Sequence, residues 1–170
     1  DQGETIIAKV SGNFLNSIQE SNIFFYRGHV RIPMSHDLAK IGDDYYIKAS
    51  LIGKTLNNYS VVIKNTQYYQ TGSISTQEIA SNFTITNKIA EFSIDKGFII
   101  TKGSFAIKTQ NLKDTSISIS VDSFSGVNPV SSLNVGGNLI KNIDFNTSSL
   151  THSTQDFIKL SSGNLVYEIP

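Results

Sequence analysis

The chain has 170 residues, enough for one domain with a buried core, and 39% of them are hydrophobic. Fourteen basic and fourteen acidic residues cancel, so the chain lacks the concentrated positive charge that nucleic-acid binding requires. It contains no cysteine, which excludes thiolate catalysis and cysteine-ligated metal sites. Its apolar runs are far shorter than the roughly 20 residues of a membrane-spanning helix, so we expect no transmembrane segment.

The first ten or so residues alternate regularly between two kinds of side chain. Apolar or small side chains occupy one face of this predicted strand, namely Ile6, Ala8, Val10, Gly12 and Phe14. Mostly polar side chains occupy the other face. The chain opens with Asp1 rather than with an initiator methionine, which is typical of a secreted chain after removal of a leader. We therefore expect an extracellular or cell-surface protein.

Period-two alternation continues along the chain and predicts further strands. They fall at residues 45–51, 59–64, 83–86, 91–95, 104–108, 115–124, 139–145, 157–160 and 165–169. Between two of these runs, residues 95–97 predict a hairpin turn with Gly97 at a positive φ. Helix is scarce: one or two turns are expected over residues 34–41, after Pro33, and another over residues 76–80.

About nine or ten strands, each with one polar face, predict an all-β fold. We expect an antiparallel β-sandwich, either immunoglobulin-like or jelly-roll-like, and a closed barrel as the second choice. Residues 1–14 are assigned to an N-terminal extension that is a candidate donor strand, and residues 15–170 to the sandwich. The N-terminal strand is either the first strand of this sandwich or a strand donated to a neighbouring subunit.

No catalytic, cofactor-binding or metal-binding residues are predicted, and an enzyme is not expected. His29, His36 and His152 are best interpreted as surface or turn residues, because no Gly-x-Ser-x-Gly motif positions a nucleophile near any of them. Asp43 and Asp44 could bind calcium only with further oxygen ligands at regular spacing, which the sequence lacks. A solvated turn is the favoured interpretation of this acidic pair.

Tyrosines and sequons suggest contacts at the surface. The pairs Tyr45–Tyr46 and Tyr68–Tyr69 could contribute to a sugar-stacking platform, although neighbours on a strand point to opposite faces. Three Asn-x-Ser/Thr sequons are candidate N-glycosylation sites, at Asn58, Asn82 and Asn146.

The segment from Ile6 to Phe14, the Ser/Thr/Asn-rich β-pattern and the sequons resemble donor-strand-exchanging, cysteine-free filament subunits. Pilins of the archaeal-thread, bundling-pilus and biofilm-matrix-fibre types have this design. The resemblance implies that the N-terminal strand inserts into the next subunit through the five residues of its apolar face. The last strand, residues 165–169, also alternates, so either terminal strand could be the one exchanged.

The resulting hypothesis is a structural subunit of an extracellular surface filament, a homo-oligomer assembled by strand exchange. It has no cofactor, and glycans or a host surface are its other candidate partners. The first alternative is a carbohydrate- or receptor-binding adhesin or lectin, which would place tyrosines in an exposed row. The second is a viral capsid or spike module of jelly-roll form.

Overall fold

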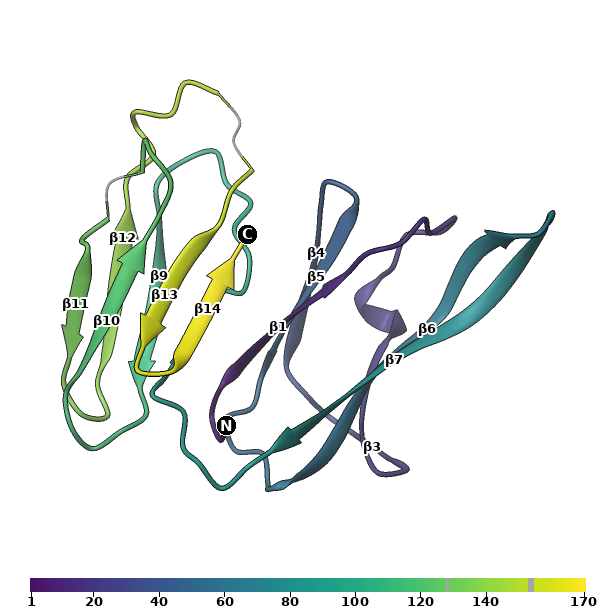
Figure 1. Cartoon of the computed structure of the whole chain (residues 1–170), viewed down its shortest axis with the longest axis horizontal. Coiled ribbons are helices and arrows are strands. Elements are labelled where there is room, and N and C mark those ends of the chain that lie inside the picture. The colour runs from purple at the N-terminus through teal and green to yellow at the C-terminus, as the bar shows by residue number, and fades with distance from the viewer. Residues whose placement is uncertain (128, 153–154) are drawn as a thin grey trace.

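The computed structural model describes residues 1–127, 129–152 and 155–170. All regular structure in these residues is β-strand, apart from one 3-10 turn, η1 (Glu20–Asn22). The strands form two lobes that lie side by side (Figure 1). We call strands β1 to β7 the N-terminal lobe and strands β8 to β14 the C-terminal lobe. The structure confirms the all-β, antiparallel sandwich fold.

The N-terminal lobe consists of two antiparallel sheets with strand orders β1-β5-β4 and β3-β2-β6-β7. Its strands are β1 (Thr5–Val10), β2 (Ile23–Arg27), β3 (Val30–Ile32), β4 (His36–Ile41), β5 (Asp44–Ser50), β6 (Asn57–Gln70) and β7 (Ser73–Ile85). Alternate residues of both sheets meet in one buried cluster, which includes Phe25, Ile47 and Ile63. The sheets therefore pack face to face, as the period-two pattern requires.

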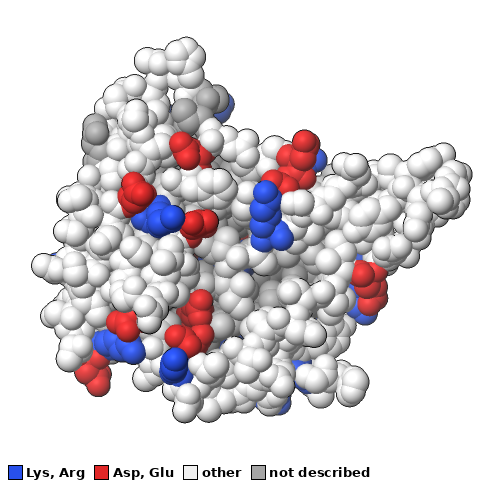
Figure 2. Space-filling model, in the orientation of Figure 1, with Lys and Arg blue, Asp and Glu red and all other residues white. Residues whose placement is uncertain are grey.

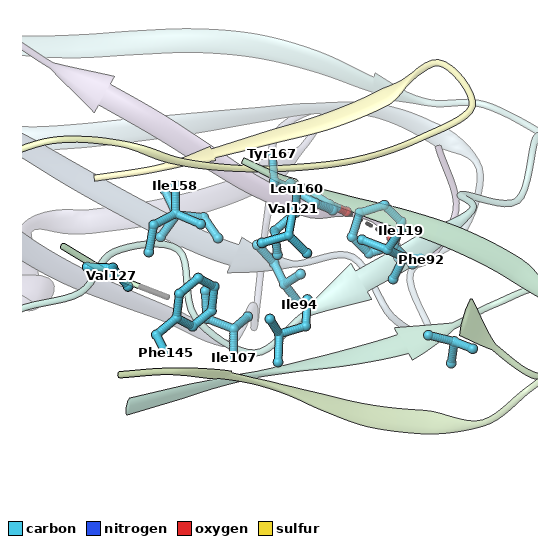
Figure 3. Close-up of a cluster of buried hydrophobic side chains, with 13 residues drawn as sticks. Phe92, Ile94, Ile107, Ile119, Val121, Val127, Phe145, Ile158, Leu160 and Tyr167 are labelled. Carbon is cyan, nitrogen blue, oxygen red and sulfur yellow. Dashed lines mark hydrogen bonds between the residues drawn. The ribbon is translucent and has the colours of Figure 1, made fainter. Parts of the chain in front are cut away.

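The C-terminal lobe has the same architecture, with strand orders β12-β9-β8 and β11-β10-β13-β14. Its strands are β8 (Phe92–Ile94), β9 (Phe105–Asn111), β10 (Ile117–Asp122), β11 (Ser132–Val135), β12 (Ile140–Phe145), β13 (Ile158–Ser162) and β14 (Leu165–Ile169). Figure 3 shows its core, in which Phe92, Ile107 and Leu160 are completely buried. We expected one sandwich over residues 15–170; the buried side chains instead form two clusters, one in each lobe.

Strand order identifies the type of sandwich in the C-terminal lobe. One sheet joins its first, second and fifth strands, and the other joins its fourth, third, sixth and seventh strands. This is a seven-stranded Greek-key arrangement of the immunoglobulin-like kind, with the fourth strand paired to the third. A jelly roll is built from eight strands, so the immunoglobulin-like form of the prediction is the one that this lobe adopts.

Both predicted helical segments are wrong. Residues 36–41 form β4, which pairs residue by residue with β5 through a turn at Gly42 and Asp43. Residues 76–80 lie within β7 and pair with β6. Local signals such as the proline before residue 34 were outweighed by ladder hydrogen bonds to a neighbouring strand, because tertiary context overrides weak propensities. Asp43 lies in an exposed turn, as expected for the acidic pair, whereas Asp44 is the half-buried first residue of β5.

A small buried network joins the two lobes. The Thr5 hydroxyl donates to the carbonyl oxygen of Ile94 (2.9 Å) and accepts from its N–H (3.2 Å). The Tyr167 hydroxyl accepts from the Thr5 N–H (3.1 Å) and donates to the carbonyl oxygen of Phe92 (3.0 Å). Thr5 and Tyr167 are almost fully buried. The N-terminal strand therefore contributes directly to the contact between the lobes.

Gly97 lies at the same interface, for a different reason from the one predicted. Its φ is not positive. A Cβ on this residue would instead lie 2.5 Å from the Cβ of Lys48 and 3.2 Å from a side-chain carbon of Ile7. Glycine is required here because the C-terminal lobe approaches the outer face of the β1-β5-β4 sheet so closely.

Candidate functional site

The predicted donor segment lies in its own chain's sheet. Strand β1 pairs antiparallel with β5 along its whole length, from Thr5 opposite Ser50 to Val10 opposite Tyr45. Four of the five predicted donor residues are partly buried and pack against the N-terminal core, namely Ile6, Ala8, Val10 and Phe14. Gly12 lies beyond the strand and is exposed. The apolar face was thus predicted well for the strand itself, and its donation to another subunit stays a prediction.

Within the described residues, β1 is an edge strand, because β5 is the single strand that pairs with it. Its far end is held at the surface, where the Lys9 ammonium lies 2.7 Å from a carboxylate oxygen of Asp44. The Ser11 hydroxyl donates to the other oxygen of the same carboxylate. Two hydrogen bonds lower the pKa of the Asp44 carboxyl group: the one from Lys9 contributes most, and the one from Ser11 comes second.

The last strand, β14, is also paired within its own chain, with β13. Tyr167 and Ile169 point into the C-terminal core and are buried. Figure 1 shows the open side of β14 facing the N-terminal lobe, near β1. Both terminal strands proposed from the sequence therefore lie close together, one in each lobe, and both complete a core in cis.

The hairpin of β6 and β7 extends beyond the sandwich as an arm, which we define as residues 65–77 (Figure 1). The arm begins at a bulge between Ile63 and Thr66, where Asn65 has a φ of 61°. It turns at Thr71 and Gly72, both with positive φ. At its tip, Tyr69 and Ile74 face each other across the strands and are 68% and 64% exposed.

The arm carries no charged side chain from residue 65 to residue 77. In Figure 2 the part that projects beyond the sandwich is white, and charged groups appear nearer its base. The sequence pattern does not predict the arm: it predicts a short strand ending at residue 64 and a helical turn over residues 76–80, both of which lie in the β6-β7 hairpin. The available signal was Gly72, a turn residue between two uncharged stretches of similar length.

One side of the arm is supported by the chain segment that follows β1. The Phe14 ring packs against Tyr68 with centroids 5.1 Å apart, and the two residues form an isolated bridge. The Asn16 amide donates to the carbonyl oxygen of Asn65 and accepts from the Gln67 N–H, each at 2.9 Å. The arm is therefore anchored along β6, whereas β7 pairs in the described residues with β6 alone.

The tyrosines do not form an exposed row in the described structure. Four of the seven tyrosines are at most 4% exposed to solvent, namely Tyr45, Tyr46, Tyr59 and Tyr167. Both members of the 45–46 pair are buried because β5 has the N-terminal core on one face and the C-terminal lobe near the other. Tyr69 alone is strongly exposed. The described residues therefore do not form the exposed row of tyrosines that the sugar-binding alternative requires.

The three sequon asparagines are exposed, as N-glycosylation requires. Asn58 and Asn82 lie on neighbouring strands, and their sequons pair across the hairpin, with Asn58 opposite Thr84 and Ser60 opposite Asn82. The Thr84 hydroxyl donates to the Asn58 side-chain oxygen at 2.7 Å. Asn146 follows β12 and accepts from the Ser148 N–H. Glycan attachment at these positions stays a prediction.

The three histidines lie in three different segments of the fold; His36, expected at the surface or in a turn, is instead the half-buried first residue of β4. His29 is exposed in the turn between β2 and β3, and Nδ1 of His36 lies 2.8 Å from the carbonyl oxygen of Met34. His152 is exposed and contacts Thr151; Ser153, which follows it in sequence, lies outside the described residues. Residues 1–127, 129–152 and 155–170 contain no group of three or more His, Asp or Glu residues able to hold a metal ion.

A shallow cavity of about 680 Å³ lies beside His36, lined mainly by apolar side chains that include Phe24 and Met34. Two cationic side chains line it, and both are engaged within the chain. The Arg31 guanidinium lies 4.4 Å from the centroid of the Phe24 ring, and the Lys54 ammonium donates to the carbonyl oxygen of Pro33. Among the described residues, no helix is long and apolar enough to cross a membrane.

The fold defines a tandem of two antiparallel β-sandwiches, with immunoglobulin-like strand order in the C-terminal lobe. No protein-family model matches the chain, and a search of curated proteins finds no match. Among solved structures, it is similar to the I9–I11 tandem from titin, at 10% identity and a TM-score of 0.30. That match covers 99% of this chain and 59% of the titin chain. So low a TM-score does not define a common fold, and the assignment rests on strand order.

Proposed function

We propose that this chain is a structural subunit of an extracellular surface filament, joined to its neighbours by exchange of β1. The observation that carries the proposal is the position of β1. It is an edge strand whose apolar side chains complete the N-terminal core, and residues 11–22 connect it to β2 without forming a strand. An identical segment from a neighbouring chain could occupy the same place.

In this proposal, the in-cis arrangement is the closed form of the subunit. Exchange replaces the chain's own β1 with that of a neighbour, so that the ladder to β5 is made between chains. Contacts that tie β1 to its surroundings, such as Thr5 with Tyr167 and Lys9 with Asp44, are then made again between chains. A head-to-tail repeat of this contact does not close on itself, and it generates a filament.

The rest of the molecule suits an external structural role. The surface is rich in uncharged polar side chains, the net charge is zero and there is no cysteine. Stability in such a setting would come from buried ladders and two hydrophobic cores rather than from disulfides. The exposed sequons fit a glycosylated surface if the host attaches glycans.

Deletion of residues 1–14 tests the proposal. The truncated protein should form no filaments by electron microscopy, because the N-terminal core has lost its closing strand. A synthetic peptide of residues 1–14 should bind it and restore the unfolding temperature of the N-terminal lobe. Filaments formed by the truncated protein at the wild-type rate would contradict the proposal.

A pair of peptides supplies the control. In Ile6→Asp the new charge would face the N-terminal core, so this peptide should not bind. Asn13→Asp adds the same charge at an exposed position and should bind as the unmodified peptide does. Equal binding of the two peptides would show that the truncated N-terminal lobe does not recognise the apolar face of β1.

A further inference from the structure

The open edge of β7 differs from every other sheet edge in the described structure. It is thirteen residues long, and the other edge strands have six residues or fewer. It contains one charged residue, Glu78, whose carboxylate lies 3.4 Å from the Lys64 ammonium on the neighbouring strand. It contains no proline, and the extra residue of the bulge belongs to β6.

Soluble proteins usually protect such edges from pairing with another chain. They keep edge strands short or place charges, prolines or bulges on them. The remaining edges follow this rule: β3 and β8 have three residues each, β4 carries Asp37 and Lys40, and β12 carries Lys141 and Asp144. The edge of β7 lacks these protections over residues 73–77.

The backbone geometry shows which groups on β7 are free to pair. The Thr66 hydroxyl donates to the carbonyl oxygen of Gln77 at 2.6 Å, so the backbone groups of Gln77 point toward β6. Neighbouring residues on a strand point to opposite sides, so those of Thr76 and Ile74 point to the open edge. Both residues are exposed.

From this edge we infer that β7 pairs with β7 of a second copy of the chain. The strands run antiparallel about a two-fold axis and join two four-stranded sheets into one continuous sheet. Residues 73–77 carry no charge, so a partner strand with charged side chains would bury them without opposite charges beside them. An uncharged strand of the same length, such as β7 of a second copy, avoids this cost. Identical edges related by a two-fold axis satisfy this requirement in both directions at once.

The side chains beside the edge add to the pairing. Ser73, Ser75, Thr76 and Gln77 are short or uncharged and can hydrogen-bond to like residues across the new pair. Ile74, exposed at the tip beside Tyr69, loses contact with water when a second arm lies next to it. This surface is separate from β1, so it would join subunits or filaments laterally whether or not β1 is exchanged.

Thr76→Lys tests the inference, because an edge lysine blocks strand pairing without altering a core contact. The matched control is Ser118→Lys, which adds the same charge at an exposed position on β10, a strand paired on both sides. By sedimentation velocity, the wild-type protein and Ser118→Lys should form dimers as concentration rises, and Thr76→Lys should remain a monomer. Both variants should keep the wild-type circular dichroism spectrum and unfolding temperature.

Hydrogen exchange locates the contact. In the dimer, the Ile74 amide should exchange at least about tenfold more slowly than in the Thr76→Lys monomer. A wild-type protein that stays monomeric, or a Thr76→Lys variant that dimerises as strongly as the wild type, would overturn the inference. Dimers abolished by removal of residues 1–14 but unchanged in Thr76→Lys would assign self-association to β1 exchange and reject pairing through β7.

Discussion

The two lobes share one kind of sheet and differ in the other. The four-stranded sheets β3-β2-β6-β7 and β11-β10-β13-β14 have equivalent strand orders. In the three-stranded sheets, β1 and β5 correspond to β9 and β12, but β8, which pairs with β9, has no counterpart beside β1. The N-terminal lobe has β4 on the far side of β5 instead. The side of β1 that lacks a strand partner is met by the C-terminal lobe, through Ile94 and Tyr167.

This difference suggests that the lobes depend on each other unequally. The C-terminal lobe has all seven strands of its sandwich, and among the described residues Ile7 of β1 is its one core neighbour from the N-terminal lobe. The N-terminal lobe has no strand beside β1, and residues of the C-terminal lobe cover that edge through hydrogen bonds to Thr5. We therefore expect the C-terminal lobe to stabilise the N-terminal lobe more than the reverse.

Matched cavities in the two cores give the largest expected effect. Leu160→Ala and Ile63→Ala each remove a buried side chain from one core, and each should cost about 2–5 kcal/mol of unfolding free energy in that lobe. Leu160→Ala should also lower protection in the N-terminal lobe, measured by hydrogen exchange in denaturant. If Ile63→Ala weakens the C-terminal lobe equally, the proposed asymmetry is wrong.

The close approach of the lobes can be broken by one methyl group. Gly97→Ala places a Cβ 2.5 Å from that of Lys48, and the resulting displacement should cost about 1–3 kcal/mol. Gly103→Ala is the control, because a Cβ there meets nothing within 4 Å and its φ is not positive. Thermal unfolding should separate the two variants. Equal unfolding temperatures would mean that the lobes can shift apart freely.

Loss of a single hydroxyl group at the interface should have a smaller effect. Tyr167→Phe leaves the Thr5 N–H and the Phe92 carbonyl without this partner and should cost about 1–2 kcal/mol. Tyr69→Phe, at an exposed position, should change the free energy of unfolding little. Chemical denaturation measures the free energy of unfolding of both variants. A Tyr167→Phe variant as stable as the wild type would show that this network does not stabilise the folded protein.

Burial also makes Tyr167 a source of pH dependence. Desolvation raises its pKa above the ordinary value of about 10. A raised pKa contributes stability that is fully present below the unfolded-state value and is lost as pH rises through the folded-state value. Above about pH 10, the wild type should therefore lose stability more steeply than Tyr167→Phe.

The smallest expected effect concerns the surface end of β1. The pKa of Asp44 is lowered by Lys9 and Ser11, so its contribution is present above the unfolded value of about 3.9 and is lost as pH falls through the folded value. Carboxyl titration followed by NMR should give a lower midpoint in the wild type than in Lys9→Gln. An unchanged midpoint would show that the ion pair does not form in solution.

Sequence periodicity determined much of the fold and part of the candidate site. Strand β14 was predicted with its observed bounds, and the apolar face of β1 was predicted for Ile6, Ala8 and Val10. Both succeed because strand alternation is a local property: each side chain points opposite to its neighbours whichever strand it pairs with. The exposed sequons followed similarly from local polarity.

Tertiary structure decided how the strands are divided and which edges remain open. Two cores instead of one, the pairing of β1 with β5, the glycine contact at Lys48 and the length of the arm all depend on residues distant in sequence. Alternation alone does not specify a partner strand, because any strand with a matching apolar face satisfies it. The open edge of β7 is a consequence of which strands pair with which, so the alternation of its side chains does not predict it.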